Sequence, residues 1–409
     1  MRTAFILIAA FVTPTGVSTR PADVPPLKVR DGYRLTAAAG DLPGAWFLEF
    51  SDAGRLFVAR PFADPVSGRP RDPAGDIVVL WDPDPDGVFR RRETFLCGRE
   101  RLHGLAWHKG WLYYTYPDEI RRARDTDGDG KADEDQRVVG PESFPLDSHR
   151  GNWWRSLLVT DDGLLTAIGD SGNITDEPAS ERQRVWAFDP NGSNKRPFAS
   201  GLRSTAKLRL RPGTREVYGI DLPTDGFGRT LGEDPASPAK GQPITDENPP
   251  GELNLLTEGG FYGHPFLAGN RVPRPEYAAR KDLVEIAART TIPAWSFPAH
   301  WRGYGFTFVD PEINRRGRGL PQDHAGDLIA AFHGSWNRST PTGACLARVL
   351  FDPQTGKPFG MLTLVDAMPD GRRPLARPVD CAQAPDGSIV FSCDLTGRIY
   401  RLRSSEPVR

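Results

Sequence analysis

A histidine and an aspartate flank one predicted β-hairpin at positions suited to acid–base chemistry. His149 precedes the apolar strand that begins near Leu157, and Asp170 directly follows the second strand of the same unit. Because an antiparallel hairpin brings its two ends to one rim, Asp170 could accept a hydrogen bond from His149. Such a bond fixes the tautomer of the imidazole and raises its basicity, as a general base for an alcohol proton requires. The alternative is a structural histidine without a catalytic role.

A second group of carboxylates lies in the acidic loop 125–133, whose sequence is DTDGDGKAD. Alternating acidic positions and a glycine at the sixth position are typical of the first half of a Ca²⁺-binding loop. The twelfth position is Gln136, so the bidentate glutamate that closes such a loop is missing. We expect either a structural Ca²⁺ site or a solvated acidic turn, formed by Asp125, Asp127, Asp129 and Asp133.

Copies of one strand–turn–strand unit provide the elements that must position these residues. Two short apolar strands flank a turn, in most copies rich in Asp and Gly, which supplies the positive φ that tight hairpins need. The copies span residues 47–60, 103–116, 157–170, 208–221, 306–333 and 380–394. The first four are spaced by roughly fifty residues, as expected for one four-stranded propeller blade each. We predict an all-β, six-bladed β-propeller whose sites lie where loops converge on the central channel; a β-sandwich with coincidental hairpins is the alternative.

The composition agrees with an all-β chain. The 409 residues include 43 glycines and 39 prolines, which favour many short strands joined by tight turns. Only the segment 274–289 is predicted to form a short helix. The net charge is −1 and no basic stripe is present, so a nucleic-acid partner is not expected.

The N-terminus has the features of an export signal. A short basic start, a short apolar run and a small-residue end predict a cleaved signal peptide over residues 1–18, although a buried strand is the alternative. Residues 19–30 are assigned to an N-terminal extension and residues 31–405 to the propeller domain. The apolar run is too short to span a bilayer, so we expect an exported periplasmic or secreted protein without a membrane anchor.

Export would place the four cysteines in an oxidising compartment. Cys381 and Cys393 flank one turn and could face each other across it. Cys97 and Cys345 would then pair or stay free. The sequence alone does not decide the pairing.

A set of further motifs runs in order through most of the chain: GLAW…LYY…DTDGDGKAD (104–133), H…WWRSL…DDGLL…IGDSGN (149–173), ASGLR (199–203), GELNLLTEGGFYGHPF (251–266), HGSWNRS (333–339) and ARPVD…APDGSI (376–389). This ordered set resembles the soluble PQQ-dependent sugar dehydrogenases, most closely their sorbosone dehydrogenase-like branch. A single piece such as APDG is common in propellers. The combination of GGFYG with HGSWNR is specific.

The resemblance implies a six-bladed propeller with PQQ across the channel and Ca²⁺ at the quinone edge. It assigns His149 as the base that takes the hydroxyl proton while hydride moves to the quinone, and Asp170 as the residue that orients His149. Arg203 would lie against the quinone oxygens and stabilise the charge that develops there.

Three residues later in the chain match family positions at or beside the cofactor carboxylates. They are Asn337 and Arg338 in HGSWNR and Arg377 in ARPVD. PQQ is a tricarboxylate, and arginine forks bind carboxylates in a bidentate manner. The resemblance therefore implies that these side chains hold the cofactor.

The chain also departs from the family pattern at the cofactor. Ser204 stands beside Arg203 where the family usually has Asn, and Val379 replaces a second arginine of the sixth-blade motif. The resemblance places main-chain ligands of Ca²⁺ near Leu222 and Pro223, with Asp221 beside them. Ser204 remains a predicted cofactor neighbour, but the grip on PQQ is expected to be weaker.

Several aromatic and histidine side chains have a simpler interpretation. Trp153 and Trp154 are expected to pack between blades, and His264 in FYGHP is expected to make a loop contact. His333, directly after a strand, is expected either in the core or at the rim.

The leading functional hypothesis is a PQQ- and Ca²⁺-dependent dehydrogenase that oxidises a sugar or a sugar-derived aldehyde or alcohol. Its partners would be a small sugar and an unidentified electron acceptor, while the sequence indicates no oligomeric state. One alternative is a non-catalytic propeller that binds a glycan or a protein through a degenerate site. Another is a calcium-dependent lactonase, for which no Glu/Asn/Asp ligand set can be assembled from the rim positions.

Overall fold

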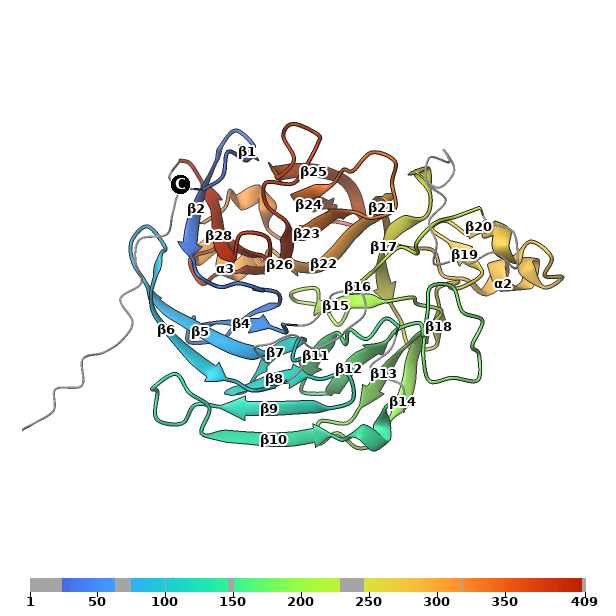
Figure 1. The fold of residues 1–409 in the computed structure, drawn as a ribbon, viewed down its shortest axis with the longest axis horizontal. Coiled ribbons are helices and arrows are strands. Elements are labelled where there is room, and N and C mark those ends of the chain that lie inside the picture. The colour runs from blue at the N-terminus through green and yellow to red at the C-terminus, as the bar shows by residue number, and fades with distance from the viewer. Residues whose placement is uncertain are drawn as a thin grey trace, which may run out of the picture.

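The computed structural model describes residues 24–62, 75–99, 101–145, 151–228, 246–317 and 319–406. Within these ranges, six mainly antiparallel sheets are arranged in a ring around a common axis, the channel axis of the propeller (Figure 1). The first strand of each sheet contacts the first strands of the two neighbouring sheets and therefore lies next to the channel. This arrangement confirms the predicted six-bladed β-propeller.

Each blade is built outward from the channel, mostly in chain order. The first two blades consist of β3 (Leu48–Phe50), β4 (Leu56–Arg60), β5 (Asp76–Pro83) and β6 (Phe89–Leu96), and of β7 (Leu105–His108), β8 (Trp111–Thr115), β9 (Ile120–Arg124) and β10 (Glu134–Val139). The next two consist of β11 (Leu157–Thr160), β12 (Gly163–Ile168), β13 (Arg184–Phe188) and β14 (Arg196–Ser200), and of β15 (Thr205–Leu210), β16 (Val217–Asp221), β17 (Pro250–Leu256) and β21 (Trp295–Ala299). The fifth consists of β22 (Trp301–Phe308), β23 (Leu328–Ser335), β24 (Ala344–Phe351) and β25 (Pro358–Asp366).

The sixth blade combines the two ends of the chain. Its inner strands are β26 (Pro378–Gln383), β27 (Ile389–Cys393) and β28 (Arg398–Ser404), and its outer strand is β2 (Tyr33–Ala39). β2 pairs antiparallel with β28, from Tyr33 opposite Ser404 to Ala39 opposite Ile399. An N-terminal strand thus closes the ring.

Short elements complete the fold. β1 (Lys28–Val29) extends the fifth blade beside β25, and β18 (Gly260–Phe261) runs parallel to β14 on the third. The others are the hairpin of β19 (Leu267–Ala268) and β20 (Val272–Pro273), helices α2 (Leu283–Arg289) and α3 (Pro311–Gly317), and the 3₁₀ turns Pro141–Ser143, Pro275–Tyr277 and Gln322–His324. No helix in the described ranges is long and apolar enough to cross a membrane.

The predicted inner hairpins are confirmed in all six blades. In the sixth, the Pro-Asp-Gly turn places Gly387 at φ +78°, a conformation that side-chain-bearing residues rarely adopt. The helix predicted over 274–289 forms only in part, because α2 begins at Leu283. Arg274 precedes Pro275 and is extended (φ −75°, ψ 130°), as steric contact with the proline ring requires.

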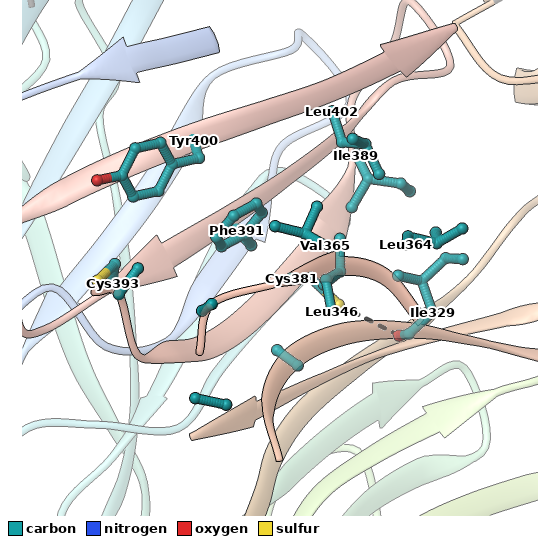
Figure 2. Close-up of a cluster of buried hydrophobic side chains, with 14 of the residues drawn as sticks. Ile329, Leu346, Leu364, Val365, Cys381, Ile389, Phe391, Cys393, Tyr400 and Leu402 are labelled. Carbon is teal, nitrogen blue, oxygen red and sulfur yellow. Dashed lines mark hydrogen bonds between the residues drawn. The ribbon is translucent and has the colours of Figure 1, made fainter. Parts of the chain in front are cut away.

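Apolar side chains fill the space between blades. In one such cluster, Ile329 and Leu346 of the fifth blade face Phe391 and Leu402 of the sixth (Figure 2). Burial of these side chains against one another is the main favourable term for docking one blade on the next.

The four cysteines are free thiols, so the possible Cys381–Cys393 disulfide is not formed. The register of the hairpin explains why: Cys381 lies opposite Phe391, and Cys393 lies opposite Pro378. The Sγ of Cys381 instead donates to the carbonyl of Ile329 at 3.2 Å (Figure 2). Cys97 is exposed, while the other three thiols are buried.

A buried ion pair joins three blades near the channel. Lys207 on β15 lies 2.6 Å from the Oδ2 of Asp380 on β26, and both side chains are at most 3% exposed. The same carboxylate oxygen accepts the main-chain N–H of Leu48 on β3 at 2.8 Å. A Cβ on Gly305 would lie 1.9 Å from Asp380 Oδ1, so glycine is required at that position.

Candidate functional site

Asp170 follows the hairpin of β11 and β12 and is fully buried. Its carboxylate accepts hydrogen bonds from the N–H of Gly172 (2.6 Å), from the N–H and hydroxyl of Thr175 (2.9 and 2.8 Å), and from Gln183 Nε2 (2.9 Å). A further bond comes from His264 Nε2 at 2.7 Å. Burial raises the pKa of Asp170, but these donors, His264 first among them, outweigh burial and hold the pKa well below its usual value.

The histidine that bonds Asp170 among the described residues is His264. His149 lies outside the described residues, so its pairing with Asp170 stays a prediction. His264 was expected to make a loop contact, and its partner Asp170 lies in the segment that follows β12; the side chain of His264 is buried there. Asn152, three residues after His149, donates its main-chain N–H to the Asp170 carbonyl at 2.9 Å and its Nδ2 to the Gly172 carbonyl at 2.9 Å.

Asp170 is expected to make stability depend on pH in acid. Its pKa is lower in the folded chain than in the unfolded chain, where it is about 3.9. Its contribution to the free energy of unfolding is therefore complete above about pH 4 and is lost as the pH falls below that value. Urea titrations should show the difference between wild type and Asp170→Asn shrinking from about pH 6 to about pH 2. A constant difference would contradict the lowered pKa.

Arg203 is buried beside the loop that follows Asp170. Its Nε and Nη2 donate to the carbonyl and Oδ1 of Asn173 at 3.2 and 3.0 Å. Asp221 fixes the backbone beneath it by accepting the main-chain N–H groups of Arg203 (2.9 Å) and Ser204 (2.8 Å) and the hydroxyl of Thr205 (3.0 Å). Burial raises the pKa of Asp221. The Nη1 of Arg203 is buried and has no hydrogen-bond partner in the described part of the chain.

A second arginine, Arg302, lies near Arg203 and was not predicted as a site residue. Asp225 lies between the two guanidinium groups: its Oδ1 is 2.6 Å from Arg302 Nη2, and its Oδ2 is 3.9 Å from Arg203 Nη2. Asn173 holds Asp225 by bonding its main-chain N–H and carbonyl, each at 2.9 Å. Arg302 belongs to none of the matched motifs, and its ion pair with Asp225, 77 positions earlier in the chain, reveals its place.

The predicted cofactor residue Arg377 is engaged with a carboxylate of its own blade. Its Nε and Nη2 donate to the two oxygens of Asp394 at 3.1 and 2.7 Å. His333 bonds the same carboxylate at 3.2 Å, which places this histidine at the end of β23 against the sixth blade. Burial alone would raise the pKa of Asp394. His333 and Arg377 have the opposite and larger effect, so the pKa is below its usual value.

The other two predicted cofactor residues follow β23 in the loop of HGSWNR. Arg338 donates Nη1 to the carbonyl of Asp246. Asn337 has a positive φ of 58°. Its Nδ2 and the Nε of Arg338 are buried without a partner within the described ranges. Both side chains therefore carry donors that a ligand could satisfy.

Aromatic side chains pack where the first, third and fifth blades meet. Trp46 and Trp154 stack with ring centroids 5.1 Å apart and planes 8° from parallel, and Tyr304 meets Trp46 edge-on at 5.4 Å. Trp153 is fully buried, as expected for packing between blades. Val379 is fully buried in the same cluster, so this position offers only apolar surface.

A small cavity is lined by Leu222 and Pro223, where the resemblance implies main-chain ligands for Ca²⁺. Its volume of about 20 Å³ suffices for about one water molecule or ion. Glu252, paired with Asp221 across β16 and β17, also lines it. Burial and the nearby Asp221 raise the pKa of Glu252 to about 8. Arg203, Arg274 and His264 line the same cavity, so cationic as well as acidic residues surround it.

The acidic loop brings three of its four predicted ligands together. Carboxylate oxygens of Asp125, Asp127 and Asp133 all lie within 4.8 Å of one another, whereas Asp129 is not part of this group. Arg55 of the first blade donates Nη1 to Asp125 at 2.6 Å. Burial raises the pKa of Asp125, but the bonds from Arg55 and from main-chain N–H groups lower it overall.

We expect Ca²⁺ to stabilise the chain through this loop. For a dissociation constant near one tenth of the added concentration, 1 mM Ca²⁺ would raise the free energy of unfolding by about 1.4 kcal/mol. Asp127→Asn should abolish the part of the gain that comes from the loop, while Asp129→Asn, outside the group of three, should keep it. Equal gains in both variants, measured by chemical denaturation with and without Ca²⁺, would assign the loop to the solvated-turn alternative.

Solved structures share this fold at low sequence identity. The PQQ domain of pyranose dehydrogenase from Coprinopsis cinerea, in its holo form, superposes with a TM-score of 0.74 at 16% identity, over 94% of this chain and 98% of that one. A calcium structure of a carbohydrate-active enzyme of family AA12 from Trichoderma reesei gives 0.72 at 19% identity, over 93% and 97%. The soluble aldose sugar dehydrogenase of Escherichia coli, in its apo form, gives 0.57 at 12% identity, over 92% and 99%. These likenesses confirm the fold that the resemblance implied.

Sequence comparisons identify one related protein and one protein family. An uncharacterized protein of Borreliella burgdorferi is 28% identical over 244 residues, which are 58% of this chain and 56% of that protein. The chain thus matches little more than half the length of this curated relative. The family model DUF7133, a domain of unknown function, matches residues 23–231. Because that match covers just over half of the 409 residues, the chain belongs to the DUF7133 family.

Proposed function

We propose that the protein is a PQQ-dependent dehydrogenase that oxidises a sugar or a sugar-derived aldehyde or alcohol. The observation that carries the proposal is the buried Nη1 of Arg203, which has no hydrogen-bond partner among the described residues. Arg203 ends the motif ASGLR, and the resemblance places this arginine against the quinone oxygens. The propeller fold shared with a PQQ domain and with an aldose sugar dehydrogenase supports it.

The residues present fit an anionic, multi-oxygen cofactor. Arg203, Asn337 and Arg338 each hold a buried N–H group without a partner among the described residues. Such donors cost stability when buried alone, and carboxylate or quinone oxygens would satisfy them. PQQ would be held by Arg203, Ser204, Asn337, Arg338 and Arg377. Arg377 could bind the cofactor only if its hydrogen bonds to Asp394 break.

The protein groups would contribute orientation, charge and proton transfer. PQQ, when bound, supplies the two-electron acceptor for the hydride of the substrate carbon. His149 would accept the proton of the substrate hydroxyl. Arg203 is held by Asn173 and Asp221 in a fixed place, so it can stabilise negative charge without reorganising. Asp170, through Asn152, fixes the chain that follows His149.

Ca²⁺ would be held by main-chain carbonyls near Leu222 and Pro223. Asp221 uses both carboxylate oxygens on the backbone and hydroxyl donors described above, which makes it a poor direct ligand. Glu252 is engaged in the same way: its Oε1 accepts the main-chain N–H of Gly269 at 2.7 Å, and its Oε2 accepts Asn254 Nδ2 at 3.3 Å. The ion would act as a Lewis acid beside the quinone.

The finer features of the proposal come from the sequence. The sorbosone-type motifs favour an aldose or sorbosone-like substrate and a separate electron acceptor. Residues 1–18 favour export to the periplasm or the medium; they lie outside the described residues. Val379, buried among aromatic side chains, favours the second candidate function, a non-catalytic propeller that binds a glycan.

Reconstitution separates these functions. Purified protein is titrated with PQQ in the presence of Ca²⁺ and then assayed for dye reduction with a panel of aldoses and sorbosone. The proposal expects PQQ binding at micromolar concentration and dye reduction with at least one sugar. Absence of binding overturns it, whereas glycan binding without PQQ would establish the second candidate.

A further inference from the structure

We infer that Arg302 is an additional carboxylate-binding residue of the proposed cofactor site and replaces the cation that the resemblance implies at Val379. The inference rests on the proposed function, because it assigns a residue to the PQQ site. No motif of the sequence points to Arg302, and its position follows from contacts between blades.

The backbone around Arg302 is irregular in a way that redirects its side chain. Arg302 lies at the start of β22, next to the channel, and the register with β23 shifts between Trp301 and Gly303. A bulge of this kind turns a side chain away from the regular alternation of the strand. The chain thereby directs a guanidinium toward Asp225, in the segment that follows β16 of the neighbouring fourth blade.

Three groups hold the guanidinium of Arg302 in place. Asp225 Oδ1 accepts from Nη2 at 2.6 Å, and the Tyr304 side chain also hydrogen-bonds it. The ring of Trp336 lies 5.5 Å from the guanidinium carbon, within the range of a cation–π contact. The side chain is only 17% exposed. A ligand would therefore meet a preorganised fork rather than a mobile surface arginine.

Asp225 is a carboxylate that two guanidinium groups share. Arg203 and Arg302 share this one carboxylate, at 3.9 and 2.6 Å. Each arginine also keeps one buried nitrogen without a hydrogen-bond partner in the described part of the chain: Nη1 of Arg203 and Nε of Arg302. Two buried N–H groups on neighbouring guanidinium groups favour an anionic ligand with carboxylate oxygens that can accept from both.

Arg302 is also placed where the cation at Val379 is missing. Val379 packs in the aromatic cluster with Trp46 and Tyr304. Tyr304 belongs to that cluster and at the same time bonds Arg302. Tyr304 thus links the guanidinium of Arg302 to the cluster that contains Val379.

The test measures PQQ affinity of the full chain with Ca²⁺, by absorbance or fluorescence titration, for three variants. Arg302→Gln should weaken PQQ binding by about 10- to 100-fold, as expected for one charge-assisted hydrogen bond. Arg302→Lys keeps the charge without the fork and should recover part of the loss. The matched control is Arg211→Gln, whose side chain is 16% exposed and also pairs with one carboxylate, Glu216, but outside the site.

Salt separates a direct contact from a structural effect. If Arg302 contacts a carboxylate of PQQ, affinity should fall less steeply with added NaCl in Arg302→Gln than in wild type and in Arg211→Gln. An affinity equal to that of wild type overturns the inference and leaves the proposed function standing. So does a weakened affinity with unchanged salt dependence and no recovery in Arg302→Lys. A wild-type chain that does not bind PQQ overturns the proposed function together with this inference.

Discussion

The His149→Ala variant is expected to bind PQQ as tightly as the wild-type chain and to reduce dye about 10²- to 10⁴-fold more slowly. The physical reason is the loss of a positioned general base, whose contribution to proton transfer is of that order. Steady-state dye reduction with a saturating sugar gives the rate, and titration with PQQ gives the affinity. The two measurements together separate a role in chemistry from a role in cofactor binding.

The matched control for this variant is His108→Ala. His108 is the last residue of β7, next to the turn that leads into β8. It therefore lies at the opposite end of its hairpin from the rim that carries the proposed site, and it contacts Asp161 at 3.0 Å. Its removal should leave the rate unchanged. Full activity of His149→Ala would place the base elsewhere and would direct attention to His264, the histidine that bonds Asp170.

The Asp170→Ala variant is expected to lose about 3–5 kcal/mol of unfolding free energy. The substitution removes a buried carboxylate and leaves His264 Nε2 and the Thr175 hydroxyl without that acceptor, whereas Gln183 keeps a bond to the Thr175 carbonyl at 2.6 Å. Chemical denaturation followed by tryptophan fluorescence measures the loss. The loss of unfolding free energy should exceed that expected for removing one hydrogen bond, because the donors to Asp170 come from three separate segments.

Asp162→Ala is the control at the other end of the same hairpin. The side chain of Asp162 is 75% exposed, and its contact with Arg215 is 3.6 Å long. Its removal should change the unfolding free energy by less than about 0.5 kcal/mol. A similar small effect for Asp170→Ala would show that the donors around Asp170 find other partners.

The hairpins of the propeller could be predicted because their causes are local. Gly387 and its Asp-Gly turn specify a tight reversal within a few residues, and the flanking alternation specifies which face is buried. The same reasoning predicted that Asp170 ends a hairpin at the rim. Trp153 and Trp154 were expected to pack between blades, although their aromatic partners, such as Trp46 and Tyr304, come from distant parts of the chain.

The rest of the site depends on which blades are neighbours and at what angle. His264 reaches Asp170 across 94 positions, and Arg302 reaches Asp225 across 77. Neither distance is set by a local pattern, because each depends on the path of a long insertion and on the docking of whole sheets. Arg302 lies in a bulge, and the sequence WRGYG does not indicate where such a bulge directs its side chain.

The pairing of β2 with β28 has a consequence for the order of events during biosynthesis. β2 is made among the first strands, but its hydrogen-bond partner is made only when the chain reaches residues 398–404. Until then the first and fifth blades each lack a neighbour on one side, and the apolar surfaces that face the sixth blade stay in contact with water or with a chaperone. Ring closure is therefore a late, post-translational step.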